Sequence, residues 1–230
     1  MGGEGDGTVR LAGGGVLHVA GALPGETVRL KAGAEGPVLD AVLQPSPFRR
    51  EPPCPHFGAC GGCALQHWDD EAALAWKVER LGTTLARERL ETEILPVIRT
   101  SPGGRRRAAL HARRGPSRAE ARIGFKARRS WSLVDIEGCR VLHPTLVAAL
   151  PGLRRLAAPF LEHPRSAPTL HVTVSETGLD VDVTGVEARS GGLSADARMA
   201  AAGIAVEFGL ARLTLAGEID IVCQRHRTQE

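Results

Sequence analysis

Three of the chain's five cysteines lie within one short stretch, at Cys54, Cys60 and Cys63. Two residues separate Cys60 from Cys63, and nearby glycines permit a tight turn that directs the sulfur atoms inward. Three thiolates this close together indicate one metal centre. A fourth ligand must come from elsewhere, and Cys139 is the candidate. This stretch constrains the fold most, because the centre would tie residue 139 to residues 54–63.

The residues alone leave the type of centre open. Zinc sites usually take two short pairs of ligands, whereas three crowded cysteines with a distant fourth are typical of iron–sulfur proteins. In a zinc site, His56 or His67 could also serve as ligands. Disulfides are disfavoured, because five is an odd number and the sequence shows no secretory hydrophobic region, so we expect reduced thiols and a cytoplasmic protein. An iron–sulfur cluster is the preferred interpretation.

The run CPHFGACGGCALQHW, residues 54–68, resembles the cluster-binding segment of the RNA uracil-5-methyltransferases, which use S-adenosylmethionine to modify tRNA or rRNA. Residues 21–26 are similar to the signature of the TRAM domain, a small RNA-binding barrel. Further on, residues 105–107, 123–125 and 134–139 are similar to the family's central β domain. The resemblance extends from about residue 5 to residue 218.

The resemblance implies a [4Fe-4S] cluster held by Cys54, Cys60, Cys63 and Cys139, and RNA as the partner. It also implies a catalytic Rossmann-like domain after the β domain. No segment here shows a strand, a G-x-G turn and a helix in succession, so we expect no S-adenosylmethionine site and no catalytic residue. Cys223 has no base or phosphate-binding loop beside it, and we assign it no catalytic role.

Positive charge is concentrated in one part of the chain. The net charge is only +3, but residues 99–140 hold eleven Arg and one Lys against three acidic residues. A compositional bias of the chain would explain why it uses Arg in place of Lys, but it does not explain why the basic residues are clustered. A cluster of positive charge is suited to binding a polyanion. Eight Phe and Trp with no Tyr argue against an aromatic stacking platform of the RRM kind, so recognition should depend mainly on phosphates and Arg planes. The candidate RNA-binding residues are Arg105, Arg106, Arg107, Arg113, Arg114, Lys126, Arg128 and Arg129.

The apolar patterns predict an α+β fold, mainly antiparallel β, in three parts. Residues 1–46 read as four short strands of an OB-like TRAM barrel whose first strand is missing, at 8–11, 15–19, 27–30 and 38–42. Residues 47–100 hold the cluster loop and a helix capped by Asp69 or Asp70, with an apolar stripe from Leu74 to Leu85 and an end at Pro96.

Residues 101–230 read as the central β domain. Strands are expected at 107–113, 122–128, 130–136, 169–174, 179–183, 210–215 and 219–222, with helices at 145–161 and from Ser194 to about 203. We expect the chain to stop before the methyltransferase domain.

The sequence therefore predicts the RNA-binding, cluster-bearing N-terminal part of an S-adenosylmethionine-dependent RNA uracil-C5 methyltransferase, inactive alone and acting with a separate catalytic half or otherwise as a monomer. The alternative is a stand-alone iron–sulfur or zinc module that presents RNA to a partner or senses redox state. No apolar run approaches the ~20 residues that a membrane span needs, so no membrane association is expected.

Overall fold

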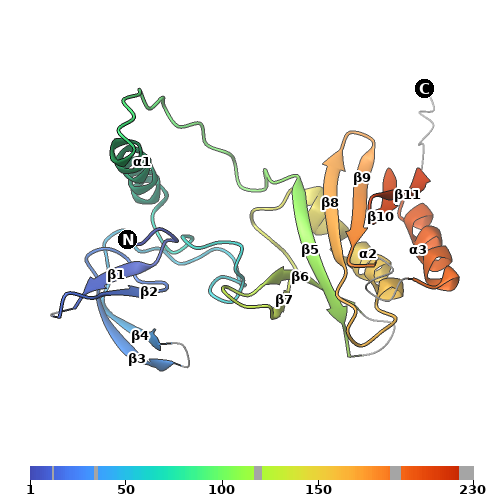
Figure 1. The fold of residues 1–230 in the computed structure, drawn as a ribbon, viewed down its shortest axis with the longest axis horizontal. Helices are drawn as coiled ribbons and strands as arrows, with labels where there is room; N and C mark the ends of the chain where they lie inside the picture. Colours follow the sequence, from blue (N-terminus) through green and yellow to red (C-terminus); the bar gives the residue numbers. More distant parts are fainter. Residues whose placement is uncertain (12, 34–35, 117–120, 187–192, 223–230) are drawn as a thin grey trace. The chain divides into compact units, whose positions relative to one another are not determined.

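The structure is a computed structural model that describes all residues except 12, 34–35, 117–120, 187–192 and 223–230, and of residues 218–222 the backbone only. The chain divides into two compact units, Met1–Arg99 and Thr100–Glu230, and each is described by itself (Figure 1). The predicted boundary near residue 46 lies within the first unit and stays a prediction. Cys223 lies outside the described residues. None of the described helices is long and apolar enough to cross a membrane.

Four strands of the first unit form where the alternating pattern predicts them, as two antiparallel hairpins. β1 (Gly7–Arg10) pairs with β2 (Val16–Val19), and β3 (Thr27–Gly33) pairs with β4 (Gly36–Gln44). Among the described residues no ladder joins the two hairpins, so the expected barrel is not closed. Leu11, Val16 and Leu43 accordingly remain 50%, 56% and 54% exposed, because no closed interior takes them up.

A buried carboxylate connects the hairpins to the segment that follows them. Glu26 accepts hydrogen bonds from Arg49, Nε to Oε1 at 2.5 Å and Nη2 to Oε2 at 2.6 Å. It also accepts the backbone amides of Leu23, at 2.8 Å, and of Ser46, at 3.1 Å. Burial alone would raise the pKa of Glu26, but these hydrogen bonds outweigh it and hold that pKa below its ordinary value. The position of segment 21–26 is therefore fixed by hydrogen bonds to its acidic residue, Glu26.

Helix α1 (Asp70–Arg87) begins at the predicted cap, where the Asp69 carboxylate accepts the amides of residues 71 and 72. It ends well before Pro96, so the predicted end is wrong. Arg89 adopts a left-handed conformation with φ of 56°, and the Leu90 amide donates to the Leu85 carbonyl at 2.9 Å. This pattern closes a helix end locally, without a proline.

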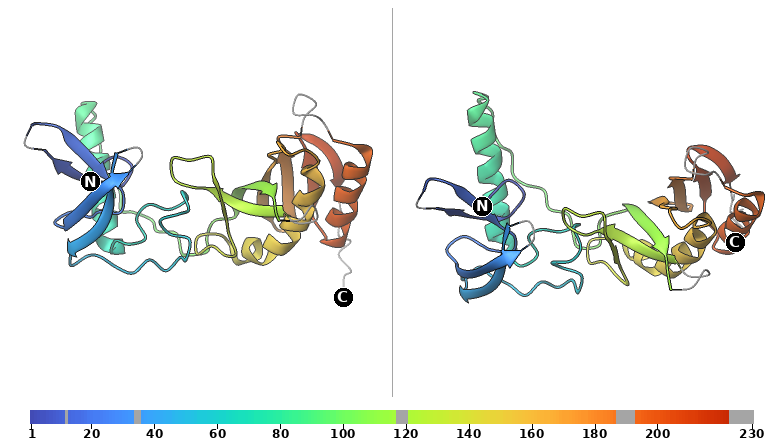
Figure 2. Two further views of the ribbon diagram at one scale, coloured as in Figure 1. Left: turned by 90° about the horizontal axis from the view of Figure 1, so that it is seen from below. Right: turned by 60° about the horizontal axis from the view of Figure 1, so that its bottom comes forward.

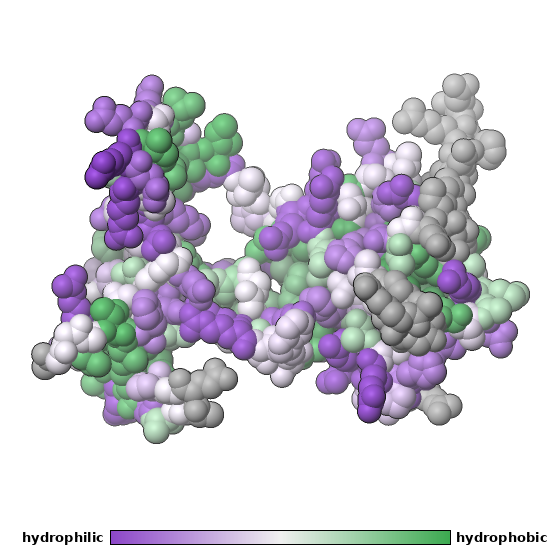
Figure 3. Space-filling view, viewed as in Figure 1, coloured by the Kyte–Doolittle hydropathy of each residue, from purple (hydrophilic) through white to green (hydrophobic). Residues whose placement is uncertain are grey.

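The apolar stripe of α1 is only partly covered. Ala73 is the one buried residue of the helix, and it packs with Leu23 and Trp68. Trp68 is buried and lies against Trp76, with ring centroids 5.7 Å apart, so both join the small core of this unit. Apolar side chains also gather on the surface around the end of α1 and the segment after it (Figure 3), including Leu95 and Ile98.

The second unit is a seven-stranded sheet with two helices against one face (Figures 1 and 2). Its order is β11-β10-β9-β8-β5-β6-β7. The strands are β5 (Arg107–Arg114), β6 (Ala121–Lys126), β7 (Leu133–Asp135), β8 (Thr169–Ser175), β9 (Gly178–Thr184), β10 (Arg212–Leu215) and β11 (Glu218–Val222). The predicted meander and hairpin are confirmed as β5-β6-β7 and β8-β9. The parallel pairing of β9 with β10 was not predicted.

Helices α2 (Pro144–Ala157) and α3 (Ala195–Glu207) supply the other half of the core, and a short 3-10 turn, η1 (Ala158–Phe160), follows α2. The predicted leucine stripe of α2 is confirmed as buried, and Ser194 caps α3 as expected. Alternate residues of the strands face the helices. Those exposed by at most 1% are Leu110, Ala112, Ile123, Leu170, Val172, Val181, Val183 and Leu213.

Helix α2 is also tied to the sheet through polar contacts. The Arg154 guanidinium donates to Asp135 Oδ1 at 2.5 Å and to the Ile136 carbonyl at 2.7 Å. The same Asp135 oxygen accepts the Ile123 amide at 3.1 Å. With α2 and α3 on one face, the alternate residues 107, 109, 111 and 113 of β5 lie on the opposite face, which we call the open face.

Candidate metal loop and candidate RNA-binding surface

The cysteine loop is a chain of tight turns held by backbone hydrogen bonds. The Phe57 amide donates to the Cys54 carbonyl at 3.0 Å, and the Cys60 amide donates to the His56 carbonyl at 2.8 Å. Between them Gly58 has φ of 87°, a conformation that a residue with a side chain rarely adopts. The predicted role of glycine in turning this loop is therefore visible at Gly58, whereas Gly61 and Gly62 do not adopt a left-handed conformation.

The described cysteines form no disulfide, and the three in the loop and Cys139 of the second unit are all half buried. The amide of Gly62 points at Cys60 Sγ, 3.4 Å away, which is the type of hydrogen bond that stabilises a metal-bound thiolate. Among the described residues, however, no three His, Cys, Asp or Glu side chains are gathered closely enough to hold a metal ion. The donor set fits an iron–sulfur cluster chemically, and the coordination of these four cysteines stays a prediction.

The two histidines beside the loop differ in their surroundings. His67 is only 2% exposed and its ring lies 5.2 Å from that of Phe57, centroid to centroid. His56 is half buried and contributes its carbonyl to the turn. His67 is thus part of the packing beneath the loop.

The open face of the second unit carries rows of polar residues across its strands. One row runs Arg107, Thr173, Asp180 and Arg212, on β5, β8, β9 and β10. In this row the Arg212 guanidinium forms a two-pronged ion pair with Asp180. In the next row Asp182 accepts the Thr214 hydroxyl at 2.5 Å. The acidic residues on this side of the sheet are therefore engaged with their neighbours.

The positive charge lies at the other side of the same face, on β5 and β6. We call this region the basic face; it consists of Arg107, His111, Arg113, Arg122 and Lys126. Partial burial, and then the charges of Lys126, Arg113 and His171, hold the pKa of His111 below its ordinary value. Lys126 and Arg113 therefore place positive charge close to His111, and a concentration of positive charge on one face is the condition that attracts a polyanion.

The predicted RNA-binding residues do not all lie on this face. Arg105, Arg106 and Arg107 are exposed, and their side chains make no hydrogen bond or ion pair with any described residue. All three line a shallow hollow of about 670 Å³ at the start of β5, and Arg106 and Arg107 also line a second hollow of about 470 Å³ beside β8. Of the predicted residues, Arg107, Arg113 and Lys126 belong to the basic face.

Three further candidates have other positions. Arg114 lies on the helix side, where its guanidinium donates to the Leu161 carbonyl at 2.5 Å and to the Glu162 carbonyl at 3.1 Å. This contact gives Arg114 a structural role in fixing the end of η1. Arg128 and Arg129 lie in the turn between β6 and β7. Sequence reasoning missed His111 and Arg122, although the alternation along β5 and β6 could have placed both beside the predicted residues.

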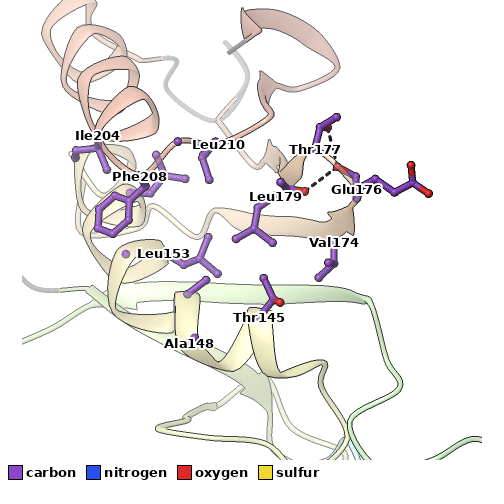
Figure 4. Close-up of a pocket in the computed structure, with 16 residues that line it drawn as sticks. Thr145, Ala148, Leu153, Val174, Glu176, Thr177, Leu179, Ile204, Phe208 and Leu210 are labelled. Atoms are coloured by element: carbon purple, nitrogen blue, oxygen red, sulfur yellow. Dashed lines mark hydrogen bonds between the residues drawn. The ribbon is translucent and has the colours of Figure 1, made fainter. Parts of the chain in front are cut away.

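A separate hollow of about 610 Å³ lies between α2, the β8-β9 turn and the end of α3 (Figure 4). Its lining is mostly apolar, and Phe208 packs directly onto Gly152, where an added Cβ would lie 2.4 Å from the ring. Glu176 is the one acidic lining residue, and its carboxylate points away from Phe208 and Leu153. This hollow therefore brings together no acid–base pair among its described residues.

Comparison with known proteins indicates the class of protein to which this chain is similar. No family model matches the chain. An uncharacterized RNA methyltransferase of Caulobacter vibrioides is 60% identical over 219 residues, which are 95% of this chain and 52% of the relative. An uncharacterized RNA methyltransferase of Brucella suis is 36% identical over 220 residues, 95% of this chain and 51% of the relative. The chain is therefore a homologue of proteins named RNA methyltransferases, over about half of their length.

The similarity also extends to a protein whose name states its reaction. The 23S rRNA (uracil(1939)-C(5))-methyltransferase RlmD of Dechloromonas aromatica is 44% identical over 151 residues, 62% of this chain and 35% of the relative. The resemblance to RNA uracil-5-methyltransferases is thus confirmed. The chain spans about half the length of the curated relatives it matches.

Proposed function

We propose that this chain is the RNA-recognition part of an S-adenosylmethionine-dependent RNA uracil-C5 methyltransferase, with rRNA as the favoured substrate class. The observation that carries the proposal is the basic face of the sheet, in a chain related over nearly its whole length to RNA methyltransferases. Methyl transfer to carbon 5 of uracil needs a nucleophile, a base and a bound methyl donor. We assign those groups to the remaining half of the longer proteins.

The basic face suits RNA because its cations stand on rigid strands rather than on a flexible tail. Arg guanidinium groups form paired hydrogen bonds with phosphate oxygens, and the neighbouring Thr169 and Thr173 offer hydroxyl groups at the same level of the sheet. Phosphate contacts of this kind set the position of an RNA and carry little sequence information. Recognition of a particular uridine would then rest on other parts of the complete enzyme.

A salt titration tests RNA binding directly. If six or more phosphates are contacted, the affinity of the full chain for a folded rRNA stem–loop should fall by about a thousandfold or more between 50 and 200 mM salt. The measurement is fluorescence anisotropy of the labelled RNA. Absence of saturable binding at the lower salt concentration would contradict the proposal.

We further propose that Cys54, Cys60, Cys63 and Cys139 hold a [4Fe-4S] cluster. The support is the turn geometry of the loop, the Gly62 amide directed at Cys60 Sγ and the family resemblance. When bound, such a cluster supplies either electron transfer or a rigid cross-link between chain segments.

Metal analysis of protein purified without oxygen tests the cluster. We expect a brown protein with iron and acid-labile sulfide in equal amounts, lost on Cys60→Ser. Cys223→Ser is the matched control and should retain the iron. Zinc without sulfide would refute the cluster, and unchanged iron in Cys139→Ser would exclude Cys139 as the fourth ligand.

A further inference from the structure

One large aromatic side chain of the second unit has no role in the core. Trp131 lies in the turn between β6 and β7 and is 79% exposed, whereas Trp68 is 6% exposed. Burying an indole is among the larger single gains in folding, so a tryptophan left in water contributes little to stability. Its position is better explained by a ligand than by packing.

The turn that carries Trp131 is fixed by its own hydrogen bonds. The Ala127 amide donates to the Ser132 carbonyl at 2.8 Å, and the Ser130 amide donates to the Ala127 carbonyl at 3.2 Å. The Ser132 amide donates to Ser130 Oγ at 3.1 Å. The backbone on both sides of Trp131 is therefore held in place, and the indole projects from an ordered turn.

One face of the indole is occupied and the other is open. Lys126 Nζ lies over the ring at 3.7 Å from its centroid, a cation–π contact that fixes the ring plane. An exposed fraction of 79% leaves the opposite face to solvent. Lys126 also belongs to the basic face and adds to the positive field at His111. The indole thus presents a flat apolar surface directly beside charges that attract phosphate.

We propose that Trp131 is a stacking site for one unpaired nucleobase of RNA, and that Lys126 and the basic face hold the phosphates next to that base. The inference rests on the proposed function and specifies its ligand further. An unpaired base is required because bases within an RNA duplex already stack on one another, and the duplex exposes mainly phosphates and hydroxyl groups. Stacking is tolerant of base identity, so the site selects single-stranded RNA rather than a sequence.

The test compares Trp131→Ala and Trp131→Phe with the unaltered chain, each bound to a single-stranded RNA and to a duplex of the same sequence. Removal of the stacking surface for one base should weaken single-strand binding of Trp131→Ala by about 5- to 100-fold. Trp131→Phe should recover most of this affinity, and duplex binding should stay the same. Because no charge is removed, the salt dependence of single-strand binding should not change in either variant.

Phe48→Ala is the matched control, since Phe48 is also exposed, at 50%, and belongs to the first unit. It should bind both RNAs as the unaltered chain does. Single-strand binding by Trp131→Ala equal to that of the unaltered chain would overturn the stacking site and leave the proposed function standing. An equal weakening for single strand and duplex would also overturn it. If the unaltered chain binds neither RNA, both the site and the proposed function are wrong.

Discussion

Glu26 holds the most heavily hydrogen-bonded of the carboxylates whose contacts are described above for the first unit. Its buried carboxylate accepts two hydrogen bonds from Arg49 and two from backbone amides. Glu26→Gln keeps the shape and removes the charge, which leaves Arg49 partly buried without its counter-ion. We expect a decrease of about 3 kcal/mol in the free energy of unfolding. Denaturant unfolding followed by tryptophan fluorescence measures it, because Trp68 and Trp76 lie in this unit.

The exposed carboxylate of Asp40 provides the control for Glu26. Asp40 pairs with Arg29 and Lys31 at the surface, so Asp40→Asn should change stability little. Equal decreases in the two variants would contradict the role of Glu26.

Acidification gives a second measurement on Glu26. Because the pKa of this group is lowered from 4.5 by folding, its stabilising effect is present above pH 4.5 and disappears as the pH falls through the folded-state pKa. The unaltered chain should therefore lose stability below that pH more steeply than Glu26→Gln.

At the scale of elements, two glycines of the second unit should respond to Ala with opposite signs. A Cβ at Gly124 of β6 would lie 2.0 Å from the Val134 carbonyl oxygen, so β7 would have to move away. We expect Gly124→Ala to destabilise the chain by about 2–3 kcal/mol. Gly203 lies exposed within α3 with no atom near its Cβ position, and Gly203→Ala should stabilise by roughly 0.5–1 kcal/mol. Thermal unfolding of both variants checks the pair, and a neutral Gly124→Ala would contradict the close approach of β7.

Most elements could be predicted from the sequence because their signals are local. The period-two runs around Leu110 and Ile123 and the leucine spacing of α2 each describe one element, and each formed where expected. The end of α1 could not be predicted, because helices usually end at a glycine or shortly before a proline. Here the helix is instead closed by Arg89 in a left-handed conformation. The parallel pairing of β10 with β9 depends on contacts between distant residues, which spacing does not encode.

At the scale of the whole molecule, the candidate sites were predictable to different degrees. The cluster of Arg residues located the RNA-binding candidates, but only the strand register separates Arg113, on the basic face, from Arg114, which binds the end of η1. Trp131 was missed because a single aromatic residue carries no pattern in a sequence; its exposure and its cation–π pairing with Lys126 reveal it. The positions of the cysteines in the sequence indicated all four candidate ligands. Metal analysis will decide whether these four residues coordinate a cluster.

The central claim is that RNA binds through the arginine-rich start of β5 and the adjoining basic face. Its most direct test replaces Arg105, Arg106 and Arg107 with Ala and compares the salt dependence of rRNA stem–loop binding with that of an equally charged control. The control replaces Arg155, Arg165 and Arg198, which are exposed on and around the helices. We predict that the first variant lowers the slope of log affinity against log salt by about one for each phosphate that the protein no longer neutralises, while the control keeps the slope. An unchanged slope in the first variant, or an equal decrease in both, would contradict the account.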